Sequence, residues 1–279
     1  MNAVLLEPTT TTRASDAAGA SMPKLSVDNL SLRFGGIVAI NALSFQVERD
    51  VICGLIGPNG AGKTSLFNCV SRLYNPSSGS IFFDGTDITS LKSKDIARLG
   101  IARTFQNLAL MKSLTVLQNV MLGGYHDGRT GLLRGSWMPV SMRAEEARLR
   151  RDVMLLLEQL ELDHLHDERV DNLSYPTLKR IELARSLAAR PSFLMLDEPA
   201  GGLSHSEVDD LAATLVRVRK EFGLTLLLVE HHMGMVMNIS DDIVVLDFGN
   251  KIAEGKPQAV KSNPRVIEAY LGKKRGDGT

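Results

Sequence analysis

The most constraining feature of this chain is the octapeptide GPNGAGKT at residues 57–64, which matches the pattern G-x-x-x-x-G-K-[ST]. Glycines in this pattern let successive backbone N–H groups turn inward and form a concave anion site that a Cβ atom would obstruct. Lys63 adds a positive charge for the outer phosphates of a nucleotide, and the Thr64 hydroxyl is a ligand for Mg²⁺. The residues predicted to bind the nucleotide here are Gly57, Pro58, Asn59, Gly60, Ala61, Gly62, Lys63, Thr64 and Ser65.

The flanks of this loop predict a strand before it and a helix after it. Residues 51–56 form a short apolar run, and residues 63–72 contain neither proline nor glycine. A helix that begins there directs the positive end of its dipole at the same phosphates. The alternative is a glycine-rich turn that fits the pattern by chance, and the strand–loop–helix order argues against it.

An acidic pair follows the apolar run at residues 193–196. The carboxyl ends of parallel strands form the edge at which α/β proteins bind ligands, so we expect Asp197 and Glu198 to lie beside the phosphates. Asp197 is predicted to hold Mg²⁺, usually through water, and Glu198 to polarise the water that attacks the γ-phosphate. The alternative, an acidic turn without a function, is common when such a pair stands alone.

Another apolar run, at residues 226–229, is followed directly by Glu230, His231 and His232. An imidazole at this strand end can donate a hydrogen bond to the γ-phosphate and respond to its hydrolysis. His231 is therefore a predicted catalytic residue, whereas His232 is predicted to be structural.

The spacing of apolar runs predicts an α/β fold. Runs at residues 193–196, 224–229 and 243–246 are separated by helical lengths of chain, which predicts a largely parallel sheet covered on both faces. Alternating apolar residues within 25–47, interrupted by two glycines, predict antiparallel strands that flank the nucleotide site. Asp84-Gly85 predicts the turn of a further hairpin.

From about residue 90 onward the sequence is predicted to be mainly helical. The clearest helices are expected at residues 115–123, 141–162 and 176–190. Ser141 is the predicted N-cap of the second of these. Its apolar stripe consists of Leu149, Val153, Leu156 and Leu160. Residues 123–139 contain five glycines and are predicted to form a loop insertion.

Charge and composition argue against several classes of function. Lys plus Arg equals Asp plus Glu at 32 each, so the basic excess of a nucleic-acid-binding protein is missing. No apolar run approaches the ~20 residues needed to cross a bilayer, so a membrane role requires a partner. Cys53 and Cys69 are predicted to be buried, reduced thiols. Residues 1–22 are predicted to be a disordered tail without the features of a secretory signal.

The order of these motifs resembles that of ABC transporter ATP-binding subunits. The resemblance covers residues 24–272 and includes, besides the loop at residues 57–64, four further motifs. These are Phe105-Gln106, Asn172-Leu173-Ser174-Tyr175, Leu196-Asp197-Glu198-Pro199 and Val229-Glu230-His231. Residues 100–107, 130–132, 246–255 and 267–272 are similar to subunits that drive the uptake of branched-chain amino acids. Related members of that branch serve urea or short amides.

This resemblance implies a P-loop NTPase (RecA-like) fold: a mostly parallel sheet core with an antiparallel β subdomain and an inserted α-helical subdomain. The ATPase domain would span residues 23–272, with the helical subdomain at approximately 90–185 and tails at 1–22 and 273–279. The expected ligands are ATP and Mg²⁺. The expected partners are transmembrane permease subunits and a second ATPase subunit, at the cytoplasmic face of the cell membrane.

The family also implies roles for three residues outside the P-loop. Phe34 would stack on adenine, although it would equally suit the core of a strand. Gln106 would link Mg²⁺ to the transmembrane partner and take part in catalysis. Ser174 would reach the γ-phosphate bound by the other subunit of a dimer. The helices between Gln106 and Asn172 would form a groove that receives a cytoplasmic helix of the permease.

The chain departs from the family in the motif L-S-G-G-Q, which here is Leu173-Ser174-Tyr175-Pro176-Thr177. Pro176 stands at the second glycine and has no N–H to offer a phosphate. Removing one donor of this kind can cost ~3 kcal/mol at a reaction centre. Ser204 replaces a usual aspartate. These departures favour a heterodimer in which hydrolysis occurs mainly on the P-loop and Glu198 of this chain.

Three alternatives stay open on sequence grounds. A soluble ABC machine acting on DNA or ribosomes would usually carry a long coiled coil, zinc cysteines or two cassettes. A GTPase would need Asn-Lys-x-Asp, whereas Asn250-Lys251 is followed by Ile252 and Ala253. A module that holds ATP without hydrolysing it conflicts with Glu198 and His231, although Pro176 is compatible with it.

Overall fold

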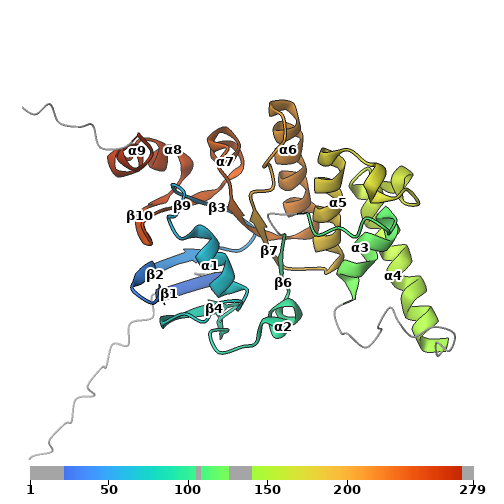
Figure 1. The fold of residues 1–279 in the computed structure, drawn as a ribbon, viewed down its shortest axis with the longest axis horizontal. Helices are drawn as coiled ribbons and strands as arrows, with labels where there is room; N and C mark the ends of the chain where they lie inside the picture. Colours follow the sequence, from blue (N-terminus) through green and yellow to red (C-terminus); the bar gives the residue numbers. More distant parts are fainter. Residues whose placement is uncertain (1–21, 105–107, 126–139, 272–279) are drawn as a thin grey trace, which may run out of the picture.

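The computed structural model describes residues 22–104, 108–125 and 140–271, and within this part the chain forms two sheets surrounded by helices (Figure 1). The strands are β1 (Leu25–Phe34), β2 (Ile37–Val47), β3 (Ile52–Ile56), β4 (Ser78–Phe83), β5 (Thr86–Asp87), β6 (Ile101–Arg103), β7 (Phe193–Asp197), β8 (Thr225–Val229), β9 (Asp242–Asp247) and β10 (Asn250–Gly255). The helices are α1 (Lys63–Val70), α2 (Ser93–Ile96), α3 (Val116–Gly124), α4 (Val140–Gln159), α5 (Tyr175–Ala188), α6 (His205–Phe222), α7 (Met233–Ile239), α8 (Pro257–Lys261) and α9 (Pro264–Leu271). Short 3-10 turns lie at Ala97–Leu99, Asp163–Leu165 and Val170–Asn172.

The larger sheet has the strand order β10-β9-β3-β8-β7-β6. Its strands β9, β3, β8, β7 and β6 are parallel, and β10 pairs antiparallel with β9 at one edge. This confirms the predicted parallel sheet, including the strands expected at residues 193–196, 224–229 and 243–246. Strand β6 was missed, because the sequence from residue 90 was predicted to be helical. Its three residues are too few to show an alternating pattern, and its pairing with β7 is a long-range contact.

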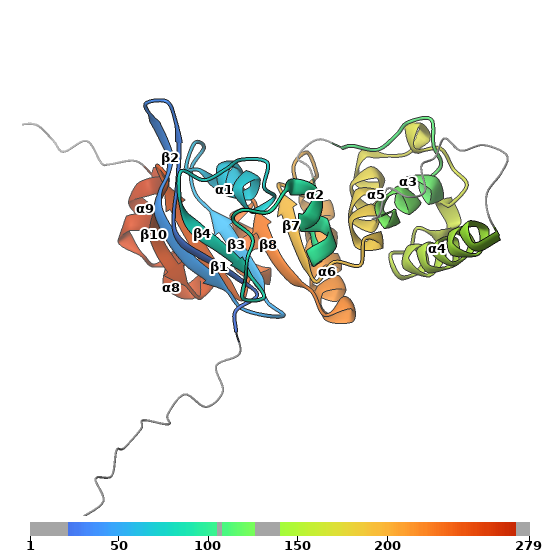
Figure 2. The same cartoon turned by 90° about the horizontal axis from the view of Figure 1, so that it is seen from below.

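The smaller sheet has the order β2-β1-β4-β5 and is antiparallel throughout. It confirms the predicted strands within residues 25–47, which are separated by Gly35 and Gly36, and the hairpin whose turn is Asp84-Gly85. Figure 2 shows this sheet lying beside the larger one, with α1 close to both.

Alternating side chains of the parallel strands enter two different cores. Along β8, Leu226 and Leu228 belong to a cluster built with α3, α4, α5 and α6. Leu227 and Val229, on the opposite face, belong to a cluster shared with α1 and the antiparallel sheet. Because side chains of a strand alternate between faces, a continuous apolar run is what burial on both faces requires.

Helices α3, α4 and α5 gather at one end of the molecule (Figures 1 and 2). Helix α3 begins after Thr115, whose side chain forms a reciprocal capping box with Gln118. The predicted stripe of α4 is confirmed, because Val153, Leu156 and Leu160 are buried and Leu149 packs against the same cluster. The predicted N-cap is wrong: α4 begins at Val140, so Ser141 lies inside its first turn.

Several predictions concern residues outside the described ranges. The tails at 1–22 and 273–279 and the loop at 123–139 are of this kind, except for Met22 and residues 123–125. No helix in the described part of the chain is long and apolar enough to cross a membrane. Cys53 and Cys69 are free and buried, as predicted.

Candidate active site

Three of the predicted motifs meet at one edge of the larger sheet. Strands β3, β8 and β7 are neighbours and parallel, and their register aligns Leu55 with Val229 and Val229 with Asp197. The loop at residues 57–62 follows β3, Glu230 and His231 follow β8, and Asp197 ends β7. The carboxyl edge of a parallel sheet is where α/β folds bind ligands, so the topology alone brings these residues together.

The loop at residues 57–62 wraps around the ammonium group of Lys63. The Nζ atom donates to the carbonyl oxygen of Gly57 at 2.7 Å and to that of Pro58 at 3.0 Å. Burial lowers the pKa of Lys63, and the carboxylates of Glu198 and Asp197 oppose this shift. Lys63 thus stands between the loop and the two acids, where it can neutralise a bound anion.

Two glycines of this loop are required by their surroundings. Gly57 has φ +152°, and a Cβ atom there would lie 2.1 Å from the carbonyl oxygen of Leu246. Gly62 has φ +101°, and its Cβ would lie 2.6 Å from the carbonyl oxygen of Ala39. Both positions therefore exclude any side chain. The loop is held from behind by the N–H of Gly249, which donates to the carbonyl oxygen of Ala61 at 3.0 Å.

The two acids after β7 have different environments. Asp197 is buried, with 3% of its side chain exposed, and its N–H donates to Thr104 Oγ1 at 3.4 Å. Glu198 is partly exposed, and its Oε1 lies 2.6 Å from His231 Nε2. A buried carboxylate with one fixed orientation suits metal binding, whereas a carboxylate paired with an imidazole at the surface suits proton transfer.

Glu230 is a residue whose role sequence reasoning missed. Its side chain is buried, with Oε1 accepting from the N–H of Ala200 at 2.6 Å and Oε2 from the N–H of His231 at 2.9 Å. It therefore ties the turn after β7 to the turn after β8. Its position at the end of an apolar run, between Val229 and the histidines, was visible in the sequence, but its partner Ala200 was not.

Arg103 was missed as well. Its Nη2 donates to Asp197 Oδ2 at 2.7 Å and its Nη1 to Asn68 Oδ1 at 2.7 Å. Only 11% of the Arg103 side chain is exposed. In the sequence this residue stood within the segment 100–107 that supports the family resemblance, without any mark of its partners.

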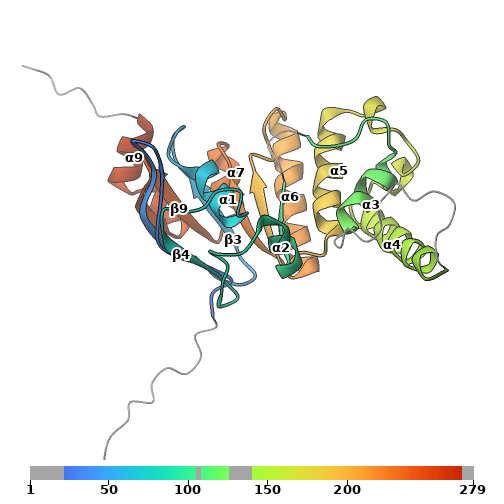
Figure 3. The same cartoon turned by 60° about the horizontal axis from the view of Figure 1, so that its bottom comes forward.

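The remaining predicted residues lie elsewhere. Phe34 is 47% exposed and makes an edge-on contact with Tyr74 at 5.2 Å, so the alternative that it is a core residue is wrong. Ser174 is exposed at the N-cap of α5, which lies on the far side of α6 from α1 (Figures 1 and 3). Gln106 lies outside the described residues. Thr64 and Ser65 occupy the first turn of α1, with Thr64 exposed.

The donor set fits a nucleotide with Mg²⁺. The hydroxyl of Thr64 and the carboxylate of Asp197 are the hard oxygen ligands that Mg²⁺ prefers, and Mg²⁺ usually takes its other ligands from water and phosphate. In residues 22–104, 108–125 and 140–271 no group of three or more His, Cys, Asp or Glu side chains could hold a metal. The site therefore fits a Mg²⁺ ion that is bound together with the phosphates of a nucleotide.

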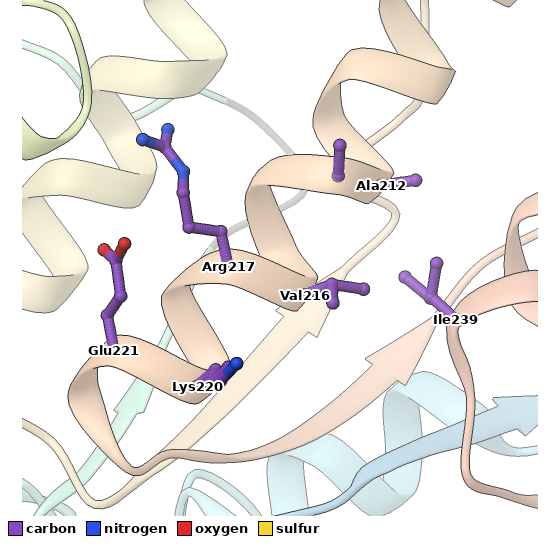
Figure 4. Close-up of a pocket in the computed structure, with 7 residues that line it drawn as sticks. Ala212, Val216, Arg217, Lys220, Glu221 and Ile239 are labelled. Carbon is purple, nitrogen blue, oxygen red and sulfur yellow. The ribbon is translucent and has the colours of Figure 1, made fainter.

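A separate hollow of ≈ 700 Å³ lies between α6 and α7 (Figure 4). Ala212, Val216 and Ile239 line it on one side, and Arg217, Lys220 and Glu221 lie along α6. None of the residues of the strand-end site lines this hollow, so we assign it no part in nucleotide chemistry.

Comparison with known proteins identifies the family of the chain. A family model described as "ABC transporter" matches residues 40–201, which include the P-loop and the acids after β7. The chain belongs to the ABC transporter family. A second model, "Branched-chain amino acid ATP-binding cassette transporter", matches residues 250–275 of this ABC chain.

Relatives of this ABC subunit match it over nearly their whole length. The high-affinity branched-chain amino acid transport ATP-binding protein BraF of Pseudomonas aeruginosa is 41% identical over 252 residues, covering 90% of this chain and 99% of the relative. LivG of Escherichia coli K12, with the same description, is 38% identical over the same shares. The crystal structure of the ADP conformation of an ABC transporter cassette has a TM-score of 0.80 and 30% identity, and covers 90% of this chain and 100% of its own. A nucleotide-free cassette has a TM-score of 0.79.

These similarities confirm the predicted fold class and the predicted ATPase. The chain is an ABC ATP-binding subunit with a mostly parallel sheet, an antiparallel sheet and surrounding helices. It binds ATP, and subunits of this family dimerise and act with transmembrane permease components. The predicted roles of individual residues are developed below as proposals.

Proposed function

We propose that this chain is the ATP-hydrolysing subunit of an importer for branched-chain amino acids, bound at the cytoplasmic face of the membrane. The observation that carries the ATPase site is the meeting of the P-loop, Asp197 and the Glu198–His231 pair at one sheet edge. The transported substrate rests on the names of BraF and LivG and on the match of residues 250–275.

Binding of the triphosphate falls to the loop and to Lys63. The N-terminal end of the α1 dipole favours negative charge, and the Lys63 ammonium lies at this helix end, bonded to the carbonyl oxygens of Gly57 and Pro58. Phosphate oxygens would then replace the carbonyl oxygens of Gly57 and Pro58 as partners of Nζ. Phe34 offers an exposed ring on which the adenine can stack.

Thr64 and Asp197 would hold Mg²⁺, with Gln106 as a further ligand in the proposed assembly. When bound, the ion neutralises charge that develops on the phosphate oxygens during transfer. The buried Asp197 carboxylate accepts a hydrogen bond from Arg103, and the backbone N–H of Asp197 donates to the Thr104 hydroxyl, so the residue is held in place before a ligand binds.

Glu198 is the proposed general base. Its carboxylate would accept a proton from the water that attacks the γ-phosphate, as the O–P bond to the ADP leaving group breaks. His231 Nε2 lies 2.6 Å from Glu198 Oε1 and would orient this carboxylate, and the imidazole would donate to the γ-phosphate in the assembled site. Glu230 fixes the backbone of His231 and thereby the position of the imidazole.

A groove of ≈ 400 Å³ between α3 and α4 is the proposed seat of the cytoplasmic helix of the permease. Leu114, Met121 and Leu122 give it an apolar floor, and Arg143, Glu146 and Arg150 provide charges. An amphipathic helix that enters an apolar groove with a charged rim is a common mode of recognition.

The second ATPase subunit is proposed to be a different chain. Ser174 is the exposed N-cap of α5, and α5 lies on the other side of α6 from α1 (Figure 3), an arrangement compatible with a site completed in trans. Pro176 occupies the first turn of α5, so one N–H of that helix end is missing. The composite site that receives the α5 end of this chain would therefore bind the γ-phosphate with one hydrogen-bond donor fewer than the other site.

Purification of the tagged chain from native membranes in mild detergent tests the assembly. We expect a polytopic permease and a second ATPase chain to co-purify with it. A strain that lacks this chain should lose uptake of radiolabelled leucine and retain uptake of urea. Recovery of the chain alone, or loss of urea uptake with leucine uptake intact, would contradict the proposal.

A further inference from the structure

Arg103 connects two elements that carry the proposed Mg²⁺ ligands. Its guanidinium donates one hydrogen bond to Asp197 at the end of β7 and another to Asn68 on α1, both at 2.7 Å. The guanidinium carbon also lies 5.3 Å from the ring centroid of Phe67 on the same helix. The group is thus held from three directions, and 11% of the side chain is exposed.

The position of Asn68 on α1 relates Arg103 to the proposed metal ligand Thr64. Residues four apart on a helix lie on one face, so Asn68 stands one turn below Thr64 on the same face of α1. A guanidinium that spans Asn68 and Asp197 therefore sets the spacing between the Thr64 hydroxyl and the Asp197 carboxylate. Arg103 bonds to Oδ2 of Asp197, which leaves Oδ1 for a metal-bound water.

We propose that Arg103 is a positioning residue for the Mg²⁺ site, which holds Asp197 at the correct distance from Thr64. This inference rests on the proposed function, because it assumes that Mg-ATP binds at the P-loop. Arg103 contacts neither nucleotide nor metal in this scheme. It acts on the metal through Asp197.

A role of the Arg103–Asp197 pair in fold stability alone explains these contacts less well than a role in positioning Asp197. A buried pair gains little net stability, because the desolvation of two charges offsets their attraction. The planar guanidinium directs two separate nitrogens at two different elements, a fixed geometry that a compact ammonium group does not share. Partners that orient metal ligands in this way typically change metal affinity by 10–100-fold when they are removed.

The test measures binding of a fluorescent ATP analogue to the full chain in excess Mg²⁺ and in EDTA. The dissociation constant in EDTA divided by the dissociation constant in Mg²⁺ reports how much the metal contributes to binding. We expect Arg103→Met to lower this ratio by about 10-fold or more while the dissociation constant in EDTA stays within about 2-fold of the wild-type value. Arg103→Lys should recover only part of the ratio, because its compact ammonium lacks the fixed planar fork that directs separate nitrogens at Asp197 and Asn68.

Asn68→Ala keeps the Arg103–Asp197 pair and removes its anchor on α1, so it tests the same inference if Arg103→Met fails to fold. We expect a smaller fall of the ratio in this variant. Arg169→Met, which breaks an exposed pair with Asp171, is the matched control and should behave as wild type.

The outcomes separate this inference from the proposed function. Wild-type protein that binds the analogue with a strong Mg²⁺ dependence supports the proposed function whatever the variants do. An unchanged ratio in Arg103→Met and in Asn68→Ala overturns the positioning role, and a raised ratio would show that Arg103 competes with the metal. Full recovery in Arg103→Lys would overturn the bridge in favour of charge alone. Wild-type protein that binds nothing would remove both proposals.

Discussion

Glu198 has a backbone φ of +51°, a conformation that residues other than glycine rarely adopt. Two hydrogen bonds hold it there, from its own N–H to the carbonyl oxygen of Val229 at 2.9 Å and from the N–H of Gly201 to its carbonyl oxygen at 3.1 Å. Glu230 fixes the neighbouring Ala200. Backbone strain held by surrounding bonds is one feature of functional residues, and the carboxylate of Glu198 lies 2.6 Å from His231 Nε2.

Glu198→Gln tests the proposed base. Glutamine has nearly the same shape but cannot accept the proton, so we expect phosphate release to fall by about 100-fold or more. The affinity for Mg-ATP should change little, because Glu198 is not a proposed phosphate ligand. Phosphate release and nucleotide binding measured on the same preparation check both statements. Turnover at the wild-type rate would remove Glu198 from its role, and Glu207→Gln, at an exposed helix cap, is the control.

Cys53 and Cys69 give a test at residue scale that is independent of nucleotide. Burial raises the pKa of Cys69 to about 11, and burial together with the nearby Asp242 and Glu254 carboxylates raises that of Cys53 further. A raised pKa leaves less thiolate at a given pH than the usual value of about 8.5 does. Folded protein at pH 8 should therefore react slowly with a thiol reagent, whereas urea-unfolded protein should label at both cysteines. Rapid stoichiometric labelling of folded protein would contradict this burial.

Residues of the candidate site were predictable from the sequence where a reactive side chain lies in, or directly after, a recognisable local pattern. The P-loop is a continuous segment, and Asp197, Glu198 and His231 each end an apolar run, so strand position and residue type pointed to them together. Arg103 was not predictable in this way. Its partners lie 94 and 35 residues away in the chain, and only the fold brings them to it.

At the scale of elements, the close packing of α3 on α5 depends on Gly123. A Cβ atom at this position would lie 1.8 Å from the carbonyl oxygen of Arg185, a backbone atom that cannot move without displacing α5. Gly234 in α7 provides the contrast, since nothing lies within 4 Å of its Cβ position. The two helices therefore meet at a distance that only a residue without a side chain permits.

Gly123→Ala should lower the free energy of unfolding by about 2 kcal/mol or more, because overpacking of a rigid contact outweighs the better helix propensity of alanine. Gly234→Ala, the matched control, should be neutral or stabilising by up to about 1 kcal/mol. Urea unfolding followed by circular dichroism measures both. Equal stability of the two variants would show that α3 and α5 can separate without loss.

Helices and strands with a long, regular sequence pattern were predicted, whereas the short strand that depends on long-range pairing was not. The stripe of α4 repeats at helical spacing, and β7, β8 and β9 are continuous apolar runs of strand length, so both kinds of pattern are recognisable in the sequence. Strand β6 has three residues and exists because β7 offers a free edge. The start of α4 at Val140 differs from the predicted cap at Ser141, because helix ends are weakly marked by single residues.

At the scale of the whole molecule, α1, which begins in the P-loop, and α5 lie on different sides of α6 (Figures 1 and 3). In the proposed assembly, Ser174 would therefore reach the phosphates bound by the other subunit, and each subunit would contribute a P-loop to one site and an α5 end to the other. In the proposed heterodimer the two sites are unequal because only one of them receives the end that contains Pro176.

Pro176→Gly tests this inequality on the isolated protein, where both sites must use the α5 end of an identical chain. The substitution restores one N–H in the first turn of α5, and one such donor at a reaction centre is worth about 3 kcal/mol, or a hundred-fold in rate. We therefore expect turnover to rise by about 10-fold or more and ATP-driven dimerisation to strengthen. Pro176→Ala restores the same N–H without the flexibility of glycine, so it should show the same direction of change. If phosphate release and the dimer fraction in size-exclusion chromatography stay at wild-type levels in both variants, the missing donor does not limit this site, and the case for an unequal pair of sites is lost.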